Sequence, residues 1–185
     1  DNPQADIFCR NASYLSCILM QCPYNEDNES TQREDAYMAR QQMSSQEREK
    51  LYKILLERSN RPGSFSQING IRITEIGDGW ARSELEITEG SLNPLGIVHG
   101  GLLCTMMDQV TGVVSCTRGS SCRTINCEVR FMAPGVKGKL HAYAEAIRLG
   151  GSLAVIRAEV RDDDGTLCAE GTYTLRLKPG NFIEA

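Results

Sequence analysis

One stretch constrains the fold more than any other, the apolar run from Leu102 to Cys116. It contains a single charged residue, Asp108, and no face of charged side chains. A helix that is hydrophobic all round is normally enclosed by other elements, so the run predicts a buried central helix. Burying a carboxylate without a partner costs several kcal/mol or forces it to take up a proton, which makes Asp108 a candidate functional residue.

The start of this helix predicts a binding site of its own. Gly100 and Gly101 expose backbone N–H groups at the positive end of the helix dipole, where an anion or a polarised carbonyl can bind. Gly100 and Asp108 are separated by about 12 Å along one helix, at about 1.5 Å per residue, so one reacting group cannot contact both. We therefore expect them to act together across a two-fold dimer of antiparallel helices.

The hydrophobic period changes from helical to alternating after residues 61–64, where Pro62 and Gly63 mark a boundary. Alternation predicts a hairpin over residues 71–87, which precedes the central helix. Four further strands are predicted after it, over residues 124–131, 140–146, 154–160 and 167–177. This order predicts an α+β fold in which one antiparallel sheet wraps around one long helix.

Three segments follow from these patterns: a helical extension over residues 1–62, a main domain over 63–179 and a tail over 180–185. Within the extension, apolar spacings predict a helix over residues 8–22, a second helix ending at Met43 and a third over 45–58. Ser44 and Glu47 form a capping box before the third helix. The apolar stripes imply packing against the main domain or another subunit, and they carry no evident chemistry.

Composition excludes several classes of protein. A net charge of -4 without a basic face argues against nucleic-acid binding. No apolar run reaches the length of a membrane span, so we expect a soluble, cytoplasmic chain without membrane contact. The eight cysteines include no Cys-x-x-Cys pair and there are only two histidines, so neither a metal nor a cofactor is expected. Cys104, Cys116 and Cys127 are interpreted as small buried hydrophobes.

The element order and several motifs together resemble one family. The motifs are Asn93, His99-Gly100-Gly101 and Asp108 at the helix, and residues 130–134 (Arg-Phe-Met-Ala-Pro) after the third strand. In this combination the chain resembles the hotdog-fold acyl-CoA thioesterases of the phenylacetic-acid degradation type, over about residues 65–178. The resemblance implies hydrolysis of an acyl- or aryl-CoA thioester to the free acid and coenzyme A, by homodimers paired into homotetramers.

Site roles follow from the resemblance, residue by residue. It implies that Asp108 is the nucleophile or general base and that the Gly100 N–H polarises the thioester carbonyl. His99 and Asn93 would shape the helix entry and orient substrate or water, and the Thr124 hydroxyl would position water. From the residues alone, other interpretations stay open: a helix-capping histidine, a plain Asn-Pro turn and an ordinary strand threonine.

Coenzyme A carries phosphates, so a mildly acidic protein that binds it needs local cations. Arginines and lysines flank the exit of the helix, the Pro134 turn and the Gly150-Gly151 pair, although solvated surface charge would explain any one of them. With Gly101 at the helix entry, the substrate-binding candidates are Gly101, Arg118, Arg123, Lys137 and Arg148. His141 lies on the outward side of its strand and is expected at the surface.

Two rivals remain. A hotdog hydratase or dehydratase would need a histidine general base, and no second histidine lies near the helix in sequence. A non-catalytic acyl-CoA sensor would use the same pocket, but residues 1–60 contain no basic helix-turn-helix and a sensor has no need of a buried carboxylate. Acyl preference stays open, because several large apolar residues could line the pocket or fill the core: Trp80, Leu92, Leu95, Met106, Met107 and Met132.

Overall fold

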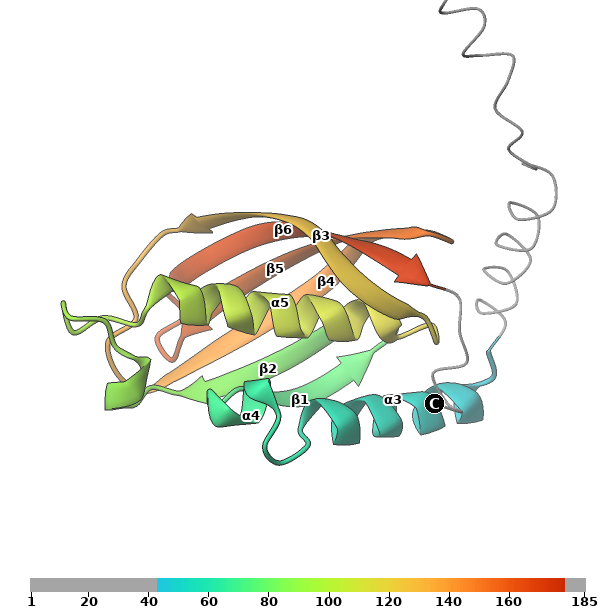
Figure 1. The fold of residues 1–185 in the computed structure, drawn as a ribbon, viewed down its shortest axis with the longest axis horizontal. Helices are drawn as coiled ribbons and strands as arrows, with labels where there is room; N and C mark the ends of the chain where they lie inside the picture. The colour runs from blue at the N-terminus through green and yellow to red at the C-terminus, as the bar shows by residue number, and fades with distance from the viewer. Residues whose placement is uncertain (1–42, 179–185) are drawn as a thin grey trace, which may run out of the picture. The chain divides into compact units, whose positions relative to one another are not determined.

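The computed structural model describes residues 43–178. Six strands form one antiparallel sheet in the order β1-β2-β4-β5-β6-β3, and the long helix α5 lies across one face of it (Figure 1). The predicted α+β hotdog arrangement is confirmed. The elements are α3 (Ser45–Ser59), α4 (Phe65–Ile68), β1 (Arg72–Gly77), β2 (Trp80–Glu86), a 3-10 turn (Glu89–Ser91), α5 (Gly100–Cys116), β3 (Ser121–Phe131), β4 (Lys139–Leu149), β5 (Leu153–Asp162) and β6 (Leu167–Lys178).

The core lies between α5 and the sheet. Met106, Met107 and Val110 are fully buried on the sheet side of the helix. Opposite them, β4 presents the small side chains of Ala142 and Ala144, which are also buried. Small residues in a strand let a helix approach the sheet closely, so the alanine-rich face predicted for β4 is the face on which α5 packs. Two of the methionines left open by the sequence therefore fill the core.

The helix α3 belongs to the predicted extension but packs on the main domain. Its capping box is present, with the Glu47 N–H donating to Ser44 Oγ and the Ser44 N–H donating to the Glu47 carboxylate. Leu51 and Leu55 are buried against Cys116 at the end of α5. The extension thus adds a second, smaller core to the sheet and helix.

Some predictions lie outside the described residues. The expected helices over residues 8–22 and up to Met43 belong to this group, and so does the tail over 180–185. Two described elements were not predicted: the 3-10 turn Glu89–Ser91 and α4, a single turn capped by Ser64. Both are too short to show a period of their own. Within residues 43–178, no helix has the length and apolar character needed to cross a membrane.

The strand β3 forms one edge of the sheet, beside β6. Most of its side chains are exposed, and they include Ile125 and Phe131, each with 57% of its surface accessible. An edge strand also presents unpaired backbone N–H and C=O groups, so an exposed apolar edge is a surface that another strand can cover. Cys127 is exposed here as well, so its interpretation as a buried hydrophobe is wrong for the single chain.

Candidate active site

One side of α5 is open, which corrects the expectation of a helix enclosed on every side. Gly101 and Asp108 are exposed, and Thr105 and Gly112 between and beyond them are half-buried. These positions recur at spacings of three and four, so they form one stripe along the helix. The sheet of a single chain covers only the opposite side. Asp108 is therefore not a buried carboxylate in this chain. It interrupts the apolar run because it lies on the open side of the helix.

Asp108 has one well-defined partner. Thr124 Oγ1 on β3 donates a hydrogen bond of 2.8 Å to Asp108 Oδ1. The resemblance implied roles for both residues, and the fold brings them together although they are 16 positions apart in the chain. Such a bond holds one carboxylate oxygen in place and leaves the other available to a ligand.

A β-bulge is what directs Thr124 toward the helix. Strict alternation along β3 would place Thr124 on the face of Asn126, away from Cys127, and the structure departs from it. The register of β3 against β6 shifts between Thr124 and Asn126, so Thr124 lies opposite the buried Leu175. Extra residues of this kind re-aim side chains next to functional sites. The inserted residue is Ile125, which has no partner in the β3–β6 register and whose side chain is exposed.

The entry of α5 exposes one backbone donor. The ring of His99, the N-cap residue, accepts a hydrogen bond of 2.9 Å at Nδ1 from the Gly101 N–H. The Gly100 N–H donates to no acceptor in the part of the chain that the structure describes. A Cβ at Gly100 would lie 3.2 Å from the Phe131 ring, so glycine lets this ring pack close to the helix start. The predicted donor is thus unoccupied, while Gly101 is already bonded.

The loop before the helix is held by its own polar groups. Asn93 Oδ1 accepts from the Leu95 N–H at 2.9 Å and from the Ile97 N–H at 3.4 Å. The His99 N–H donates to the Ser91 carbonyl oxygen, and the Val98 N–H donates to that of Gly135. Asn93 therefore shapes the helix entry by closing a turn, as one of the two interpretations from the sequence expected. Leu95, one of the apolar residues left open, is 82% exposed.

A groove of about 370 Å³ runs from Asp108 and Thr124 toward the end of α5. Its walls come from α5, from the start of β3 and, unexpectedly, from α3, which contributes Leu55, Arg58 and Ser59. This volume lies in the lower part of the range of small-molecule pockets, about 300–1,000 Å³. The capping box and apolar stripe predicted α3, but no local pattern could show that its last turn would reach the catalytic candidate.

Two thiols line the same groove. Cys116 Sγ lies 3.8 Å from Cys122 Sγ, between the end of α5 and the start of β3. The hydrogen bond donated by Cys116, together with burial, raises the pKa of Cys116. The same bond lowers the pKa of Cys122, against the effect of burial. Within residues 43–178, no group of three or more His, Cys, Asp or Glu side chains could hold a metal ion.

The predicted cationic candidates are widely separated. Arg118 Nε forms an ion pair of 3.0 Å with Asp78 in the β1–β2 turn, and Arg48 of α3 pairs with the same carboxylate at 2.7 Å. Arg123 lies near the start of β3, in a second groove. Lys137 and Arg148 are exposed, Lys137 beyond the far end of β3 and Arg148 near the end of β4. The strand β3 has 11 residues and spans about 35 Å. Arg123 and Lys137, near its opposite ends, therefore cannot hold one phosphate within a chain.

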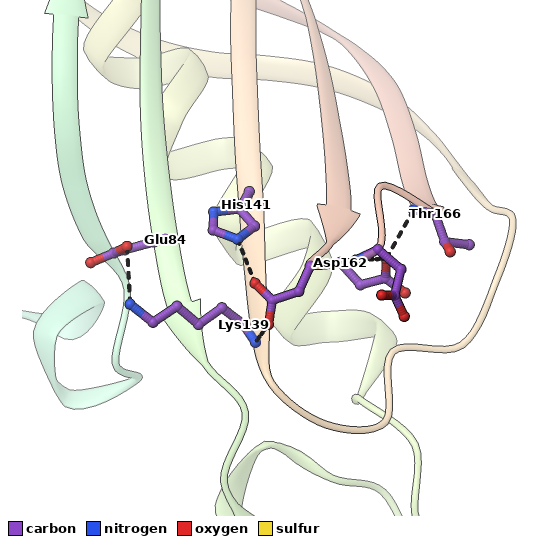
Figure 2. A network of polar contacts seen from close by, with 7 residues as sticks. Glu84, Lys139, His141, Asp162 and Thr166 are labelled. Atoms are coloured by element: carbon purple, nitrogen blue, oxygen red, sulfur yellow. Dashed lines mark hydrogen bonds and ion pairs between the residues drawn. The ribbon is translucent and has the colours of Figure 1, made fainter.

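The outer face of the sheet carries a separate polar network. His141 Nε2 lies 2.9 Å from Asp163 Oδ1, and Lys139 Nζ pairs with Glu84 at 3.4 Å (Figure 2). Nearby, Asp162 Oδ1 accepts from the Thr166 N–H. His141 is exposed, as predicted. Its charged neighbours are paired with one another on the face opposite α5, so this network stabilises the surface and lies apart from Asp108.

Comparisons with known proteins agree with this fold. A model of the thioesterase superfamily matches residues 95–169. A Deinococcus radiodurans protein named "Putative esterase" is 31% identical over 118 residues, which cover 62% of this chain and 81% of that protein. The 1,4-dihydroxy-2-naphthoyl-CoA hydrolase of Escherichia coli is 24% identical, with coverage of 68% of this chain and 96% of that enzyme.

Among solved structures, the PaaI protein from the Escherichia coli phenylacetic acid degradation operon has the same fold. Its TM-score is 0.65 at 21% identity, with coverage of 71% of this chain and 98% of that chain. The fold and these relatives thus define a hotdog thioester hydrolase. The chain belongs to the thioesterase superfamily.

Proposed function

We propose that the protein hydrolyses an acyl- or aryl-CoA thioester, with Asp108 as nucleophile or general base. The observation that carries this proposal is the Asp108 carboxylate, exposed on α5 and oriented by Thr124 at one end of a ligand-sized groove. The coenzyme A part is supported by the E. coli relative, whose name gives a CoA thioester as its substrate.

The Thr124 hydrogen bond assigns different tasks to the two carboxylate oxygens. Oδ1 is held by the hydroxyl, so Oδ2 is the oxygen that faces the reaction. As a base, it takes a proton from water while the water oxygen attacks the thioester carbon. As a nucleophile, it attacks that carbon itself, and water then hydrolyses the resulting anhydride. In both cases the C–S bond breaks and coenzyme A leaves as a thiolate, which takes up a proton.

The developing charge on the carbonyl oxygen needs a donor, and the unoccupied Gly100 N–H is suited to it. Because about 12 Å separates Gly100 from Asp108 along α5, the donor must come from a second copy. The open side of α5 and the exposed edge strand β3 are the surfaces that such a copy would cover. We therefore place each site between two protomers of a homodimer, and expect dimers to pair into tetramers as the resemblance implies.

A panel of acyl-CoA and aryl-CoA thioesters with a thiol reagent tests the activity. We expect released thiol from the wild type and at least a 100-fold lower kcat from Asp108→Asn, with little change in Tm. Tight binding without thiol release would instead favour a sensor, and hydration of an enoyl-CoA would favour a hydratase. Retained turnover in purified Asp108→Asn would remove Asp108 from the mechanism.

Mixing two inactive variants tests the shared site. Asp108→Asn removes the carboxylate, and Gly100→Val obstructs the backbone N–H that would donate to the carbonyl oxygen. In a heterodimer, one site carries both changes and the other carries neither. After equal exchange about half the dimers are mixed, so about a quarter of wild-type activity should return if sites are independent. Exchange is verified by tagged pull-down. Verified heterodimers without activity above either parent would place the whole site within one chain.

A further inference from the structure

A second groove, of about 610 Å³, lies where β3 begins and β6 ends. It contains three cations, Arg123, Arg176 and Lys178. Arg176 lies between the buried Leu175 and Leu177 in β6, so its side chain points to the outer face of the sheet. Only Arg123 was singled out from the sequence, because the other two read as the ordinary solvated side of an alternating strand.

The arrangement of these cations is unfavourable unless an anion is bound. Arg123 and Arg176 are directly opposite each other in the β3–β6 ladder. Like charges in this position destabilise a sheet. None of the three cations forms an ion pair within residues 43–178. In contrast, Arg161 on the neighbouring strand β5 is paired with Glu159 at 3.0 Å, so the fold does neutralise arginines elsewhere on this sheet.

The cationic groove and the Asp108 groove share two lining residues. Ser121 and Cys122 line both of them, at the first two positions of β3. From Ser121 to Thr124 the strand advances by about 10 Å. The pantetheine arm of coenzyme A, from the sulfur to the first phosphorus, is as long as about four extended residues, or roughly 14 Å. An arm of this length is longer than the stretch from Thr124 to Ser121, and Ser121 is paired with Lys178 in the β3–β6 ladder.

We propose that Arg123, Arg176 and Lys178 bind the phosphate groups of the coenzyme A part of the substrate, and that the pantetheine arm passes Ser121 and Cys122 to present the thioester to Asp108. This inference rests on the proposed function and identifies where the charged end of its substrate binds. The adjacent turn at Gly151 and Ser152 forms the far wall of the phosphate subsite. Lys137 and Arg148, which also were candidates, have no part in it.

Two thioesters of the same acyl group separate phosphate binding from chemistry. One carries coenzyme A, and the other carries N-acetylcysteamine, which has no phosphate. Each single change, Arg123→Gln, Arg176→Gln or Lys178→Gln, should raise KM for the acyl-CoA about five- to tenfold without lowering kcat. The triple variant should raise it about 100-fold. With the N-acetylcysteamine thioester, kcat/KM should stay within about twofold of wild type.

Two further readouts exclude a structural effect. Removing the repulsion between Arg123 and Arg176 should leave Tm at or above that of the wild type. Raising the salt concentration should raise KM for the acyl-CoA in the wild type and hardly at all in the triple variant. The matched control is Arg157→Gln, an exposed arginine of β5 opposite Glu145, which should leave both substrates unaffected.

The outcomes are distinguishable from failure of the proposed function. Equal losses with both thioesters, or no loss with the acyl-CoA, would overturn the phosphate subsite. If the wild type hydrolyses neither thioester, the proposed hydrolysis fails, and calorimetry with free coenzyme A still tests the subsite. Binding to the wild type that is lost in the triple variant supports the subsite, and equal binding by both proteins contradicts it.

Discussion

The two sides of α5 come from one apolar stretch of sequence, but they differ in burial and in the residues they carry. The sheet side carries Met106, Met107 and Val110, each fully buried. The open side carries Gly101, Asp108 and Gly112, of which the first two are exposed and the third is half-buried. The sheet side is therefore built for folding, and the open side holds a carboxylate and two residues without side chains, which leave space for a ligand or a second helix.

This division means that stability and activity should respond to different substitutions in one helix. A change on the sheet side removes contacts in a close-packed core. A change on the open side removes a group that the fold of the single chain does not need. Proteins often retain such groups for function rather than for stability. The Asp108→Asn variant described above is one half of this comparison, and three further variants test the rest.

The largest effect is expected on the sheet side. Met106→Ala should lower the free energy of unfolding by about 2–5 kcal/mol, because it leaves a cavity between α5 and the sheet. Chemical denaturation at one fixed protein concentration measures this. The kcat per folded molecule should stay near that of the wild type. The control is Lys53→Ala on the exposed side of α3, with a change of about 0.5 kcal/mol or less. A loss of kcat as large as that of Asp108→Asn would contradict the separation of stability on the sheet side from activity on the open side.

On the open side, Thr124→Val removes the hydroxyl that orients Asp108 and keeps the shape of the side chain. A hydrogen bond to a charged group contributes about 1.5–3 kcal/mol, so kcat should fall about 10- to 100-fold. Since the bond lies at an exposed site, Tm should change little. Thr124→Ser keeps the hydroxyl and should restore most of the activity. Equal activity of the valine and serine variants would show that the Thr124 hydroxyl has no part in orienting Asp108 for catalysis.

The smallest effect concerns α3, whose residues Leu51 and Leu55 pack against the end of α5. Asp78 ties α3 to the end of α5 through Arg48 and Arg118. Partial burial of Asp78 opposes its ionisation, but hydrogen bonds from Arg118 and Arg48 outweigh this and lower its pKa. Asp78→Asn should therefore cost about 1 kcal/mol or less, since these pairs are partly exposed.

The pH dependence of this contribution has a definite sign. Because the folded-state pKa of Asp78 lies below the unfolded value of about 3.9, the stabilisation is present above that value. It is lost as the pH falls through the folded-state pKa. Stability measured against pH should thus separate wild type and Asp78→Asn at neutral pH and bring them together as the pH falls through the folded-state pKa of Asp78. A difference that persists in strong acid would mean that the asparagine perturbs packing instead.

Much of this protein could be predicted from local sequence alone. The alternation of apolar residues predicted the strands, and the unbroken apolar run predicted α5, because periods of 2 and 3.6 report directly which face of an element is buried. The capping box before α3 and the turn at Asp78 and Gly79 were also predicted, since both depend on contacts between near neighbours in the chain. Asp108 stood out because a charge in an apolar run is rare.

The site itself depends on contacts that no local pattern contains. The side of α5 that stays open was settled by the sheet, which covers only the other side. Thr124 reaches Asp108 through a bulge, a one-residue shift in pairing with β6 that the alternation of β3 does not show. The approach of α3 to the groove and the pairing of Arg123 with Arg176 join residues far apart in the chain. Sequence periodicity reports burial along one element, whereas these contacts depend on how separate elements pack, and only the tertiary structure determines that.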